Sequence, residues 1–296
     1  MSKEIMTQAT NKITIVGKLL DTTFNAGMTK DGRPYERANL TIRTVQSYGG
    51  RQEISEIPVS AFATQFTSKN TLNPAYESLQ RLKELKTAQN VGIDAADTIK
   101  INSGSLRENA FVARSGQLVS GWQIGSSFFN SGLGDDTATF SVDIYILDMR
   151  EEVDREDEIT GRLVVKGGIV QYGGKLDVVE FIVESPECVD HITRNWQVND
   201  TVNARGRIRV TSQEEKRVSS ESSWGEDVPD APSTKIVREL IITTGSECGF
   251  DEEMAYDSAD IKKAFNVRKA NMEQLQVNAK QAPVKATPQK SQYSWE

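Results

Sequence analysis

Apolar and polar residues alternate with a period of two along two blocks of the chain. Between positions 37 and 43, Ala38, Leu40 and Ile42 are apolar, whereas the odd positions are polar or basic. Residues 137–149 alternate in the same way and place four apolar residues on one face, namely Phe140, Val142, Ile144 and Ile146. This is the period of a strand with one buried face and one solvated face. The pattern predicts a mainly β protein.

The same order of elements follows in both blocks. In the first, the pattern predicts three strands, an amphipathic helix and two strands, over residues 12–21, 35–45, 53–63, 75–88, 97–103 and 116–129. In the second, it predicts that order again, over residues 137–149, 162–171, 176–183, 186–196, 201–211 and 235–244. Three strands, a helix and two strands is the order of the OB fold, a five-stranded barrel. Because the same order of elements occurs twice, the assignment of an OB fold to each block is stronger than it would be for one block alone.

We therefore expect two tandem OB-like five-stranded β-barrels, each with an inserted helix. A length of 296 residues exceeds the usual size of one domain and agrees with this count. The expected boundaries are 11–133 for the first barrel, 137–248 for the second, 251–278 for a C-terminal helix and 279–296 for a flexible tail. Asp257 or Ser258 is expected to cap the C-terminal helix.

Charge is distributed unevenly along the chain. The net charge is −7, which taken alone argues against a polyanionic ligand. Residues 1–133, however, carry 15 Lys and Arg against 11 Asp and Glu, a net charge of +4, and the remainder carries −11. Because local patches rather than the total charge decide nucleic-acid binding, such a ligand stays open.

The strongest basic pattern lies in residues 201–211. Arg205, Arg207 and Arg209 share one face of the predicted strand about 7 Å apart, since the rise is about 3.3 Å per residue. Phosphates of a single strand have a comparable spacing, so this face suits a nucleic-acid backbone. The alternative is a solvated strand face paired with nearby acidic loops.

Other predicted strands and hairpins offer further candidates for the same ligand. A tyrosine among arginines is useful because every base has a π-face on which it can stack. The candidate nucleic-acid-binding residues are Tyr35, Arg37, Arg43, Lys100, Trp122, Lys166, Tyr172, Lys175, Arg205, Arg207 and Arg209. Trp122 and the phenylalanines at positions 62, 66, 111, 128 and 129 are equally well core residues. We expect one groove across both domains, with the arginine strand at one end.

Signatures of catalysis are missing from the sequence. There is no GxxxxGK(S/T) phosphate cradle, and His191, the sole histidine, lacks the flanking motif of a hydrolase. Two cysteines and one histidine are too few for a structural zinc site. No apolar run suits a signal peptide or a membrane span. We therefore expect a cytoplasmic, non-enzymatic protein without cofactor, metal or membrane contact.

Residues 11–66 resemble the first three strands of bacterial single-strand-binding proteins, in the segments NKITIVGKLLDTTFN and ERANLTIRTVQSYGGRQEISEIPVSAFATQF. The tandem arrangement, with a helix around DIKKAFNVRKANMEQL, resembles phage-type single-stranded DNA-binding proteins of the OB fold. This resemblance implies sequence-tolerant binding of displaced single strands in DNA replication and recombination. It also implies recruitment of other replication proteins, in the host cytoplasm for a phage-encoded chain.

The end of the chain departs from the bacterial pattern. Bacterial relatives end in an acidic tip with a terminal Pro-Phe, whereas this chain ends SQYSWE after three lysines. Tyr293, Trp295 and Glu296 are candidates for an analogous partner-binding tip, in a monomer or homodimer. Two other functions stay open: a β-rich structural or assembly protein of a virion, and a metal-dependent nuclease.

Overall fold

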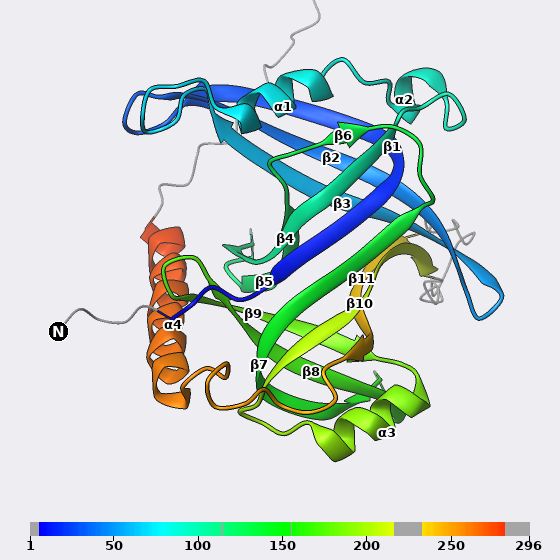
Figure 1. Ribbon diagram of the computed structural model, residues 1–296, viewed down its shortest axis with the longest axis vertical. Helices are drawn as coiled ribbons and strands as arrows, with labels where there is room; N and C mark the ends of the chain where they lie inside the picture. The colour runs from blue at the N-terminus through cyan, green and yellow to red at the C-terminus, as the bar shows by residue number, and fades with distance from the viewer. Residues whose placement is uncertain (1–5, 114, 155, 216–232, 282–296) are drawn as a thin grey trace, which may run out of the picture.

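Strands dominate the computed structural model, which describes residues 6–113, 115–154, 156–215 and 233–281 (Figure 1). The strands are β1 (Asn11–Met28), β2 (Pro34–Tyr48), β3 (Arg51–Thr64), β4 (Thr98–Val112), β5 (Leu118–Gly125), β6 (Asn130–Ser131), β7 (Thr137–Val153), β8 (Ile159–Gln171), β9 (Lys175–Val183), β10 (Thr201–Glu215) and β11 (Ser233–Gly245). The helices are α1 (Pro74–Leu82), α2 (Ala88–Val91), α3 (Pro186–Asn195) and α4 (Ser258–Gln281). The expectation of a mainly β protein is confirmed.

The first barrel is a closed ring of five strands. β1 pairs antiparallel with β2 and with β4, β2 pairs with β3, and β4 pairs with β5. A short parallel ladder between β3 and β5 closes the ring. Helix α1 lies between β3 and β4 in the chain, which is the order of the OB fold.

The second barrel repeats this ring strand for strand. β7 pairs with β8 and with β10, β8 pairs with β9, and β10 pairs with β11. A parallel pairing between β9 and β11 closes the ring, and α3 lies between β9 and β10 in the chain. The two tandem OB-like barrels expected from the sequence are therefore present.

The period-two pattern decides which residues face the interior of each barrel. On β2, Ala38, Leu40 and Ile42 are buried, while the alternating residues Arg37 and Asn39 are exposed. Each strand of a barrel is covered on one face by the strands opposite and is open to water on the other, so alternation satisfies both faces.

Helix α1 is shorter than its amphipathic pattern predicts. It begins after Asn73, whose side chain accepts a hydrogen bond from the backbone N–H of Ala75, and it ends at Leu82. Further on, the N–H of Lys86 donates to the carboxylate of Asp97 at 2.7 Å, and the N–H of Asp97 donates to the carbonyl of Lys86 at 2.9 Å. These bonds tie the stretch to the start of β4 in place of another helical turn.

An approximate two-fold axis relates the two barrels. β1 and β7, the first strands of the two rings, pair antiparallel with each other. The backbone N–H of Val210 on β10 donates to Ser55 Oγ on β3 at 3.2 Å, and the N–H of Glu108 on β4 donates to Asp177 Oδ2 on β9 at 3.1 Å. Both bonds join the fourth strand of one ring to the third strand of the other. The two halves therefore contact each other in the same way.

Helix α4 begins at Ser258, later than the sequence pattern predicts. The carboxylate of Asp257 accepts hydrogen bonds from the backbone N–H groups of Ala259 at 2.8 Å and Asp260 at 3.1 Å. Of the two predicted caps, Asp257 is therefore the one that caps the helix. The helix packs beside β4 and β9 and so touches both barrels (Figure 1).

Glu108 of β4 is the polar contact that holds α4 in place. Arg268 donates from Nε to Glu108 Oε2 at 2.6 Å and pairs with it again through Nη2, while Ser120 Oγ donates to Oε1 at 2.6 Å. Burial raises the pKa of Glu108, but the hydrogen bonds from Arg268 and Ser120 outweigh burial, so the pKa lies below its ordinary value. Glu108 therefore stays ionised and joins β4, β5 and α4.

Gly206 on β10 is a position where a side chain cannot fit. A Cβ at Gly206 lies 1.8 Å from the carbonyl oxygen of Ile241 and 2.8 Å from the ring of Phe140. We expect Gly206→Ala to lower the free energy of unfolding by about 2 kcal/mol or more, because strand backbones must move apart. Chemical denaturation measures this. Gly121→Ala on β5, where no atom lies within 4 Å of the new Cβ, is the control, and equal losses in the two variants contradict the prediction.

Removal of the Arg268 guanidinium leaves the Glu108 carboxylate buried without its cation. We expect Arg268→Ala to cost about 3 kcal/mol of stability at pH 7, with faster hydrogen exchange along α4. The pKa of Glu108 is lower in the native protein than in the unfolded chain. The ion pair between Glu108 and Arg268 therefore stabilises the native protein fully at a pH above the pKa that Glu108 has in the unfolded chain, and this stabilisation is lost as the pH falls through its pKa in the native protein. The deficit of the variant must therefore shrink below about pH 4. Lys269→Ala, an exposed neighbour on the same helix, is the control and is expected to change neither readout.

Candidate nucleic-acid interface

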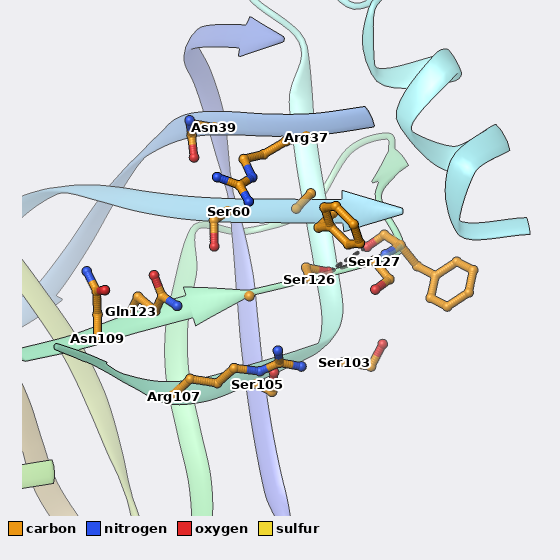
Figure 2. Close-up of a pocket in the computed structure, with 14 residues that line it drawn as sticks. Arg37, Asn39, Ser60, Ser103, Ser105, Arg107, Asn109, Gln123, Ser126 and Ser127 are labelled. Atoms are coloured by element: carbon orange, nitrogen blue, oxygen red, sulfur yellow. Dashed lines mark hydrogen bonds between the residues drawn. The ribbon is translucent and has the colours of Figure 1, made fainter. Parts of the chain in front are cut away.

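A groove of about 790 Å³ crosses the outer face of the first barrel. Figure 2 shows Arg37 of β2 and Arg107 of β4 at opposite sides of the groove, with Ser60 of β3 and Gln123 of β5 between them. The residues that line it are Arg37, Asn39, Ser60, Ala61, Phe62, Ser103, Ser105, Arg107, Asn109, Gln123, Gly125, Ser126, Ser127 and Phe128. These lining residues include two arginines and no carboxylate, so the groove is basic.

A bulge in β4 turns Arg107 toward the groove. The register of β4 against β1 shifts by one residue between Ile101 and Gly104. The outward positions therefore change from even numbers, such as Lys100, to odd numbers, such as Arg107. The sequence prediction ended this strand at residue 103 and missed Arg107, because Asn102 and Ser103 at the bulge both point outward and interrupt the alternation that a strand pattern needs.

Three phenylalanines stand on the outer face of the first barrel. Phe62, Phe111 and Phe128 are 47%, 50% and 49% exposed. The ring of Tyr35 lies 5.2 Å from that of Phe62, and the guanidinium carbon of Arg37 lies 6.0 Å from the Phe62 centroid. Such exposed rings beside a guanidinium form a surface on which flat π-systems can stack. By contrast, Phe129, another candidate from the sequence, is buried.

Of the predicted residues of the first barrel, Arg37 lines the groove and Tyr35 lies beside the lining residue Phe62, whereas Arg43 and Lys100 lie elsewhere. Arg43 is half-buried further along β2, opposite Glu56 in the register with β3. Lys100 lies beside Gly134, with the lysine Cε 3.0 Å from the position of a Cβ at that glycine. Neither Arg43 nor Lys100 lines the groove.

Trp122 belongs to the core, which corrects its assignment as a stacking surface. It is only 7% exposed. The guanidinium carbon of Arg238 on β11 lies 4.4 Å from its ring centroid, and Arg238 Nη2 donates to the Trp122 carbonyl at 2.9 Å. Burial lowers the pKa of Arg238. The indole therefore packs between the barrels and offers no free face to a base.

The hairpin residues predicted in the second barrel also lie away from the groove. Lys166 lines a hollow beside Phe265 of α4, and Lys175 lines another hollow between the hairpin and α4. Tyr172 at the tip of the hairpin is exposed. The structure does not bring these three residues together with Arg37 and Arg107.

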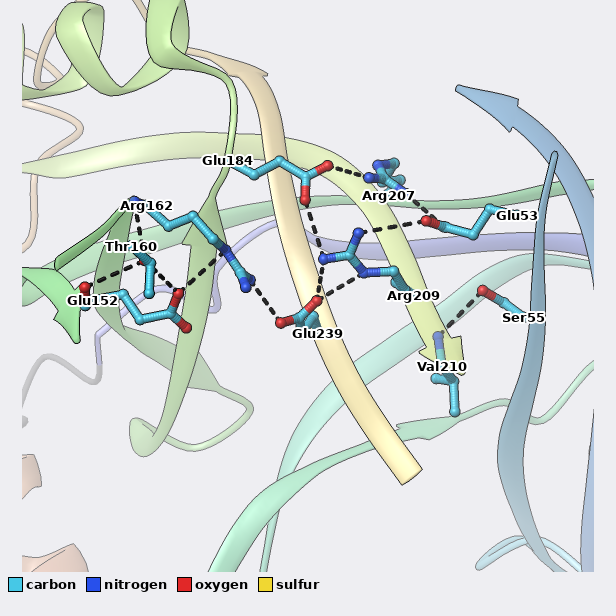
Figure 3. A network of polar contacts seen from close by, with 10 residues as sticks. All are labelled: Glu53, Ser55, Glu152, Thr160, Arg162, Glu184, Arg207, Arg209, Val210 and Glu239. Atoms are coloured by element: carbon cyan, nitrogen blue, oxygen red, sulfur yellow. Dashed lines mark hydrogen bonds and ion pairs between the residues drawn. The ribbon is translucent and has the colours of Figure 1, made fainter. Parts of the chain in front are cut away.

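The arginine triplet of β10 does not form the expected open basic face. Arg205 is exposed and donates to Asn203 Oδ1 at 2.6 Å. Arg207, in contrast, is only 5% exposed and pairs with Glu53 at 2.5 Å and also with Glu184 (Figure 3). The alternation of the strand was predicted correctly, but the sequence pattern could not show that carboxylates from distant parts of the chain cover this face.

Arg209 is held in the same network as Arg207. Its Nε donates to Glu239 Oε2 at 2.7 Å, its Nη2 lies 3.1 Å from Glu184, and Arg162 of β8 reaches the other oxygen of Glu239 at 2.6 Å (Figure 3). Burial raises the pKa of Glu239, but the hydrogen bonds from Arg162 and Arg209 lower it by more, so the pKa of Glu239 lies below its ordinary value. Glu239 therefore stays charged and pairs with both Arg162 and Arg209. Because Arg207 and Arg209 are held in these ion pairs, the expected single groove across both barrels is not formed.

Some candidates fall outside the described residues. Tyr293, Trp295 and Glu296, the predicted partner-binding tip, are among them. Within the described part of the chain, no three His, Cys, Asp or Glu side chains gather in a way that could hold a metal ion. No described helix is long and apolar enough to cross a membrane.

The wild-type single-stranded DNA binding protein from Thermus aquaticus is similar in structure, with 12% identity, a TM-score of 0.49, and coverage of 86% of this chain and 98% of that chain. A deletion mutant of the Thermus aquaticus single-stranded DNA binding protein has 13% identity, a TM-score of 0.46, and coverage of 83% and 98%. No curated protein matches this chain in sequence. The family model described as YorF matches residues 9–278, and the chain therefore belongs to the YorF family.

Proposed function

We propose that this protein binds single-stranded DNA without sequence preference, through the groove on the first barrel. The observation that carries the proposal is that Arg37 and Arg107 share one groove, without a carboxylate in its lining, with the exposed phenylalanine rings of Phe62 and Phe128. Guanidinium groups bind phosphates bidentately, and exposed rings stack on bases of any identity.

The character of the surface favours single strands over duplex. Phe62 and Phe128 can stack only on bases whose faces are free, and a duplex hides those faces inside its own stack. The serine, asparagine and glutamine side chains around them offer hydrogen bonds to phosphate, sugar or base edges without selecting one base. A single strand can therefore use both parts of the groove at once.

A role follows from the resemblance to phage-type single-stranded DNA-binding proteins. The protein protects displaced strands during DNA replication and recombination, acts by binding rather than catalysis, and works as a monomer or homodimer. The tip residues Tyr293, Trp295 and Glu296 recruit other replication proteins in this proposal. The mixture of basic and aromatic groups in one groove supports the binding step on which these roles depend.

Binding is tested directly by fluorescence titration of the whole protein with oligo-dT and with a duplex of equal length, at two salt concentrations. We expect tight binding to oligo-dT that weakens steeply with salt, because bound phosphates release counterions, and little affinity for duplex. Equal binding to both ligands, or binding to neither, overturns the proposal.

Arg37 and Arg107 on one side, and the ring of Phe62 on the other, are expected to contribute to DNA affinity in ways that can be measured separately. Arg37→Ala with Arg107→Ala should make the slope of log K against log salt shallower by about 1.4, at about 0.7 per phosphate of a single strand. Phe62→Ala should weaken binding roughly tenfold and leave the slope unchanged, because stacking releases no counterion. Arg194→Ala on α3, an exposed arginine of the second barrel, is the matched control for charge. A slope that changes equally with Arg194→Ala places the contacts elsewhere.

A further inference from the structure

The two-fold relation between the barrels assigns each position of the groove an equivalent in the second barrel. Gly104 of β4 pairs with Ile13, Gly206 of β10 pairs with Phe140, and Ile13 and Phe140 face each other across the β1–β7 ladder. Gly104 and Gly206 are therefore equivalent. Three residues further along each strand stand two arginines, Arg107 and Arg209, and their cross-strand partners are Gln123 and Glu239.

The parallel ladders extend the match to the other strands. Ser60 pairs with Gly125 in the first ring and Ile182 pairs with Ile241 in the second, which makes Ser60 and Ile182 equivalent. Two residues further along, Phe62 is equivalent to Glu184.

Two further relations complete and check the match. The antiparallel partner of Phe62 on β2 is Arg37, and the corresponding register position on β8 is Arg162. The same match makes Ser55 equivalent to Asp177, the two side chains that accept the symmetric bonds between the barrels. The assignment therefore has independent support.

The two equivalent faces differ in charge at two positions. The first barrel has Arg37, Arg107, Phe62 and Gln123, whereas the second has Arg162, Arg209, Glu184 and Glu239. Both faces keep the two arginines, but only the second supplies two carboxylates. In the second barrel these carboxylates bond the arginines (Figure 3). The arginines of the first barrel line the groove, and no ion pair of theirs occurs within the described residues.

The long β2–β3 hairpin adds a cover to the second face alone. Glu53 pairs with Arg207, and the ring of Tyr48 lies 4.2 Å from the Arg207 guanidinium. In the first barrel the equivalent of Arg207 is Ser105, which lines the open groove. The equivalent of Glu53 on the other hairpin is Lys175, so that hairpin carries a cation where the first carries a carboxylate.

From this comparison we infer that single-stranded DNA contacts the first barrel only, and that Glu184 and Glu239 keep the equivalent face of the second barrel closed to anions. The inference rests on the proposed function and defines which half of the molecule performs it. A phosphate on the second face would have to displace a carboxylate from a partly buried arginine, and the displaced carboxylate would repel it at close range. The second barrel therefore acts as a support for the β2–β3 hairpin.

The test replaces two groove residues of the first barrel by the glutamates that stand at the equivalent positions of the second barrel. Phe62→Glu with Gln123→Glu places two carboxylates beside Arg37 and Arg107 on an exposed surface, and a thermal melt verifies that the variant is folded. We expect at least a tenfold loss of affinity for oligo-dT at low salt. The second variant is Arg205→Glu, a charge reversal on an exposed residue of the second barrel at the position equivalent to the groove residue Ser103. We expect it to keep both the affinity and the salt slope of the native protein.

The outcomes separate the two proposals. If the native protein does not bind oligo-dT, the proposed function fails. If the native protein binds and the Phe62→Glu, Gln123→Glu variant binds equally well, or if Arg205→Glu weakens binding as much as that variant does, the restriction to the first barrel is wrong. Binding lost in the first variant and kept in the second supports the inference.

Discussion

The pairing of β1 with β7 is the constraint on which the rest of the architecture depends. Asn11–Val16 of β1 pair with β7, residues 13–18 pair with β4, and residues 18–28 pair with β2. A strand has only two edges, so β7 and β2 must share one edge of β1 while β4 takes the other. The change of partner falls at Gly17, where a Cβ would lie 2.3 Å from the carbonyl oxygen of Arg43. A long first strand with a glycine at this point makes one sheet out of two barrels.

Joining the barrels in this way brings the fourth strand of each against the third strand of the other. In one half the contact buries Arg207 and partly buries Arg209 among Glu53, Glu184 and Glu239. Burial of charges costs solvation energy, which is offset only where each charge has a partner with good geometry. In the other half the buried carboxylate is Glu108, and α4 supplies its partner. The same contact thus buries a cation in one half and an anion in the other, with different consequences for the outer surface.

The sequence pattern predicted the strands well because each barrel strand has one solvent-exposed face and one buried face. It failed where that rule is broken. Arg107 was missed because two consecutive residues, Asn102 and Ser103, point outward at the bulge before it. Arg207 was misplaced because it is polar at an outward position that another strand covers. Trp122 is a further example, since the guanidinium that covers its ring belongs to β11, more than a hundred residues later in the chain. Local periodicity contains no information about such partners.

The sequence alone determined that the chain forms two OB-like barrels. The features that predict them are the alternation of apolar and polar residues, the turn residues and the order of elements, and each of these features depends on neighbours within a few residues. Composition located the basic half of the chain. Only the tertiary structure decided which arginines are free and which are paired, because their partners are distant in the sequence. Glu184 and Glu239 meet Arg209 within the second barrel, and Glu53 reaches Arg207 from the first. In the sequence, Arg37 and Arg209 are alike, because both belong to basic strands. In the structure, Arg37 lies in a groove that Phe62 and Gln123 also line, whereas Arg209 is bonded to Glu184 and Glu239.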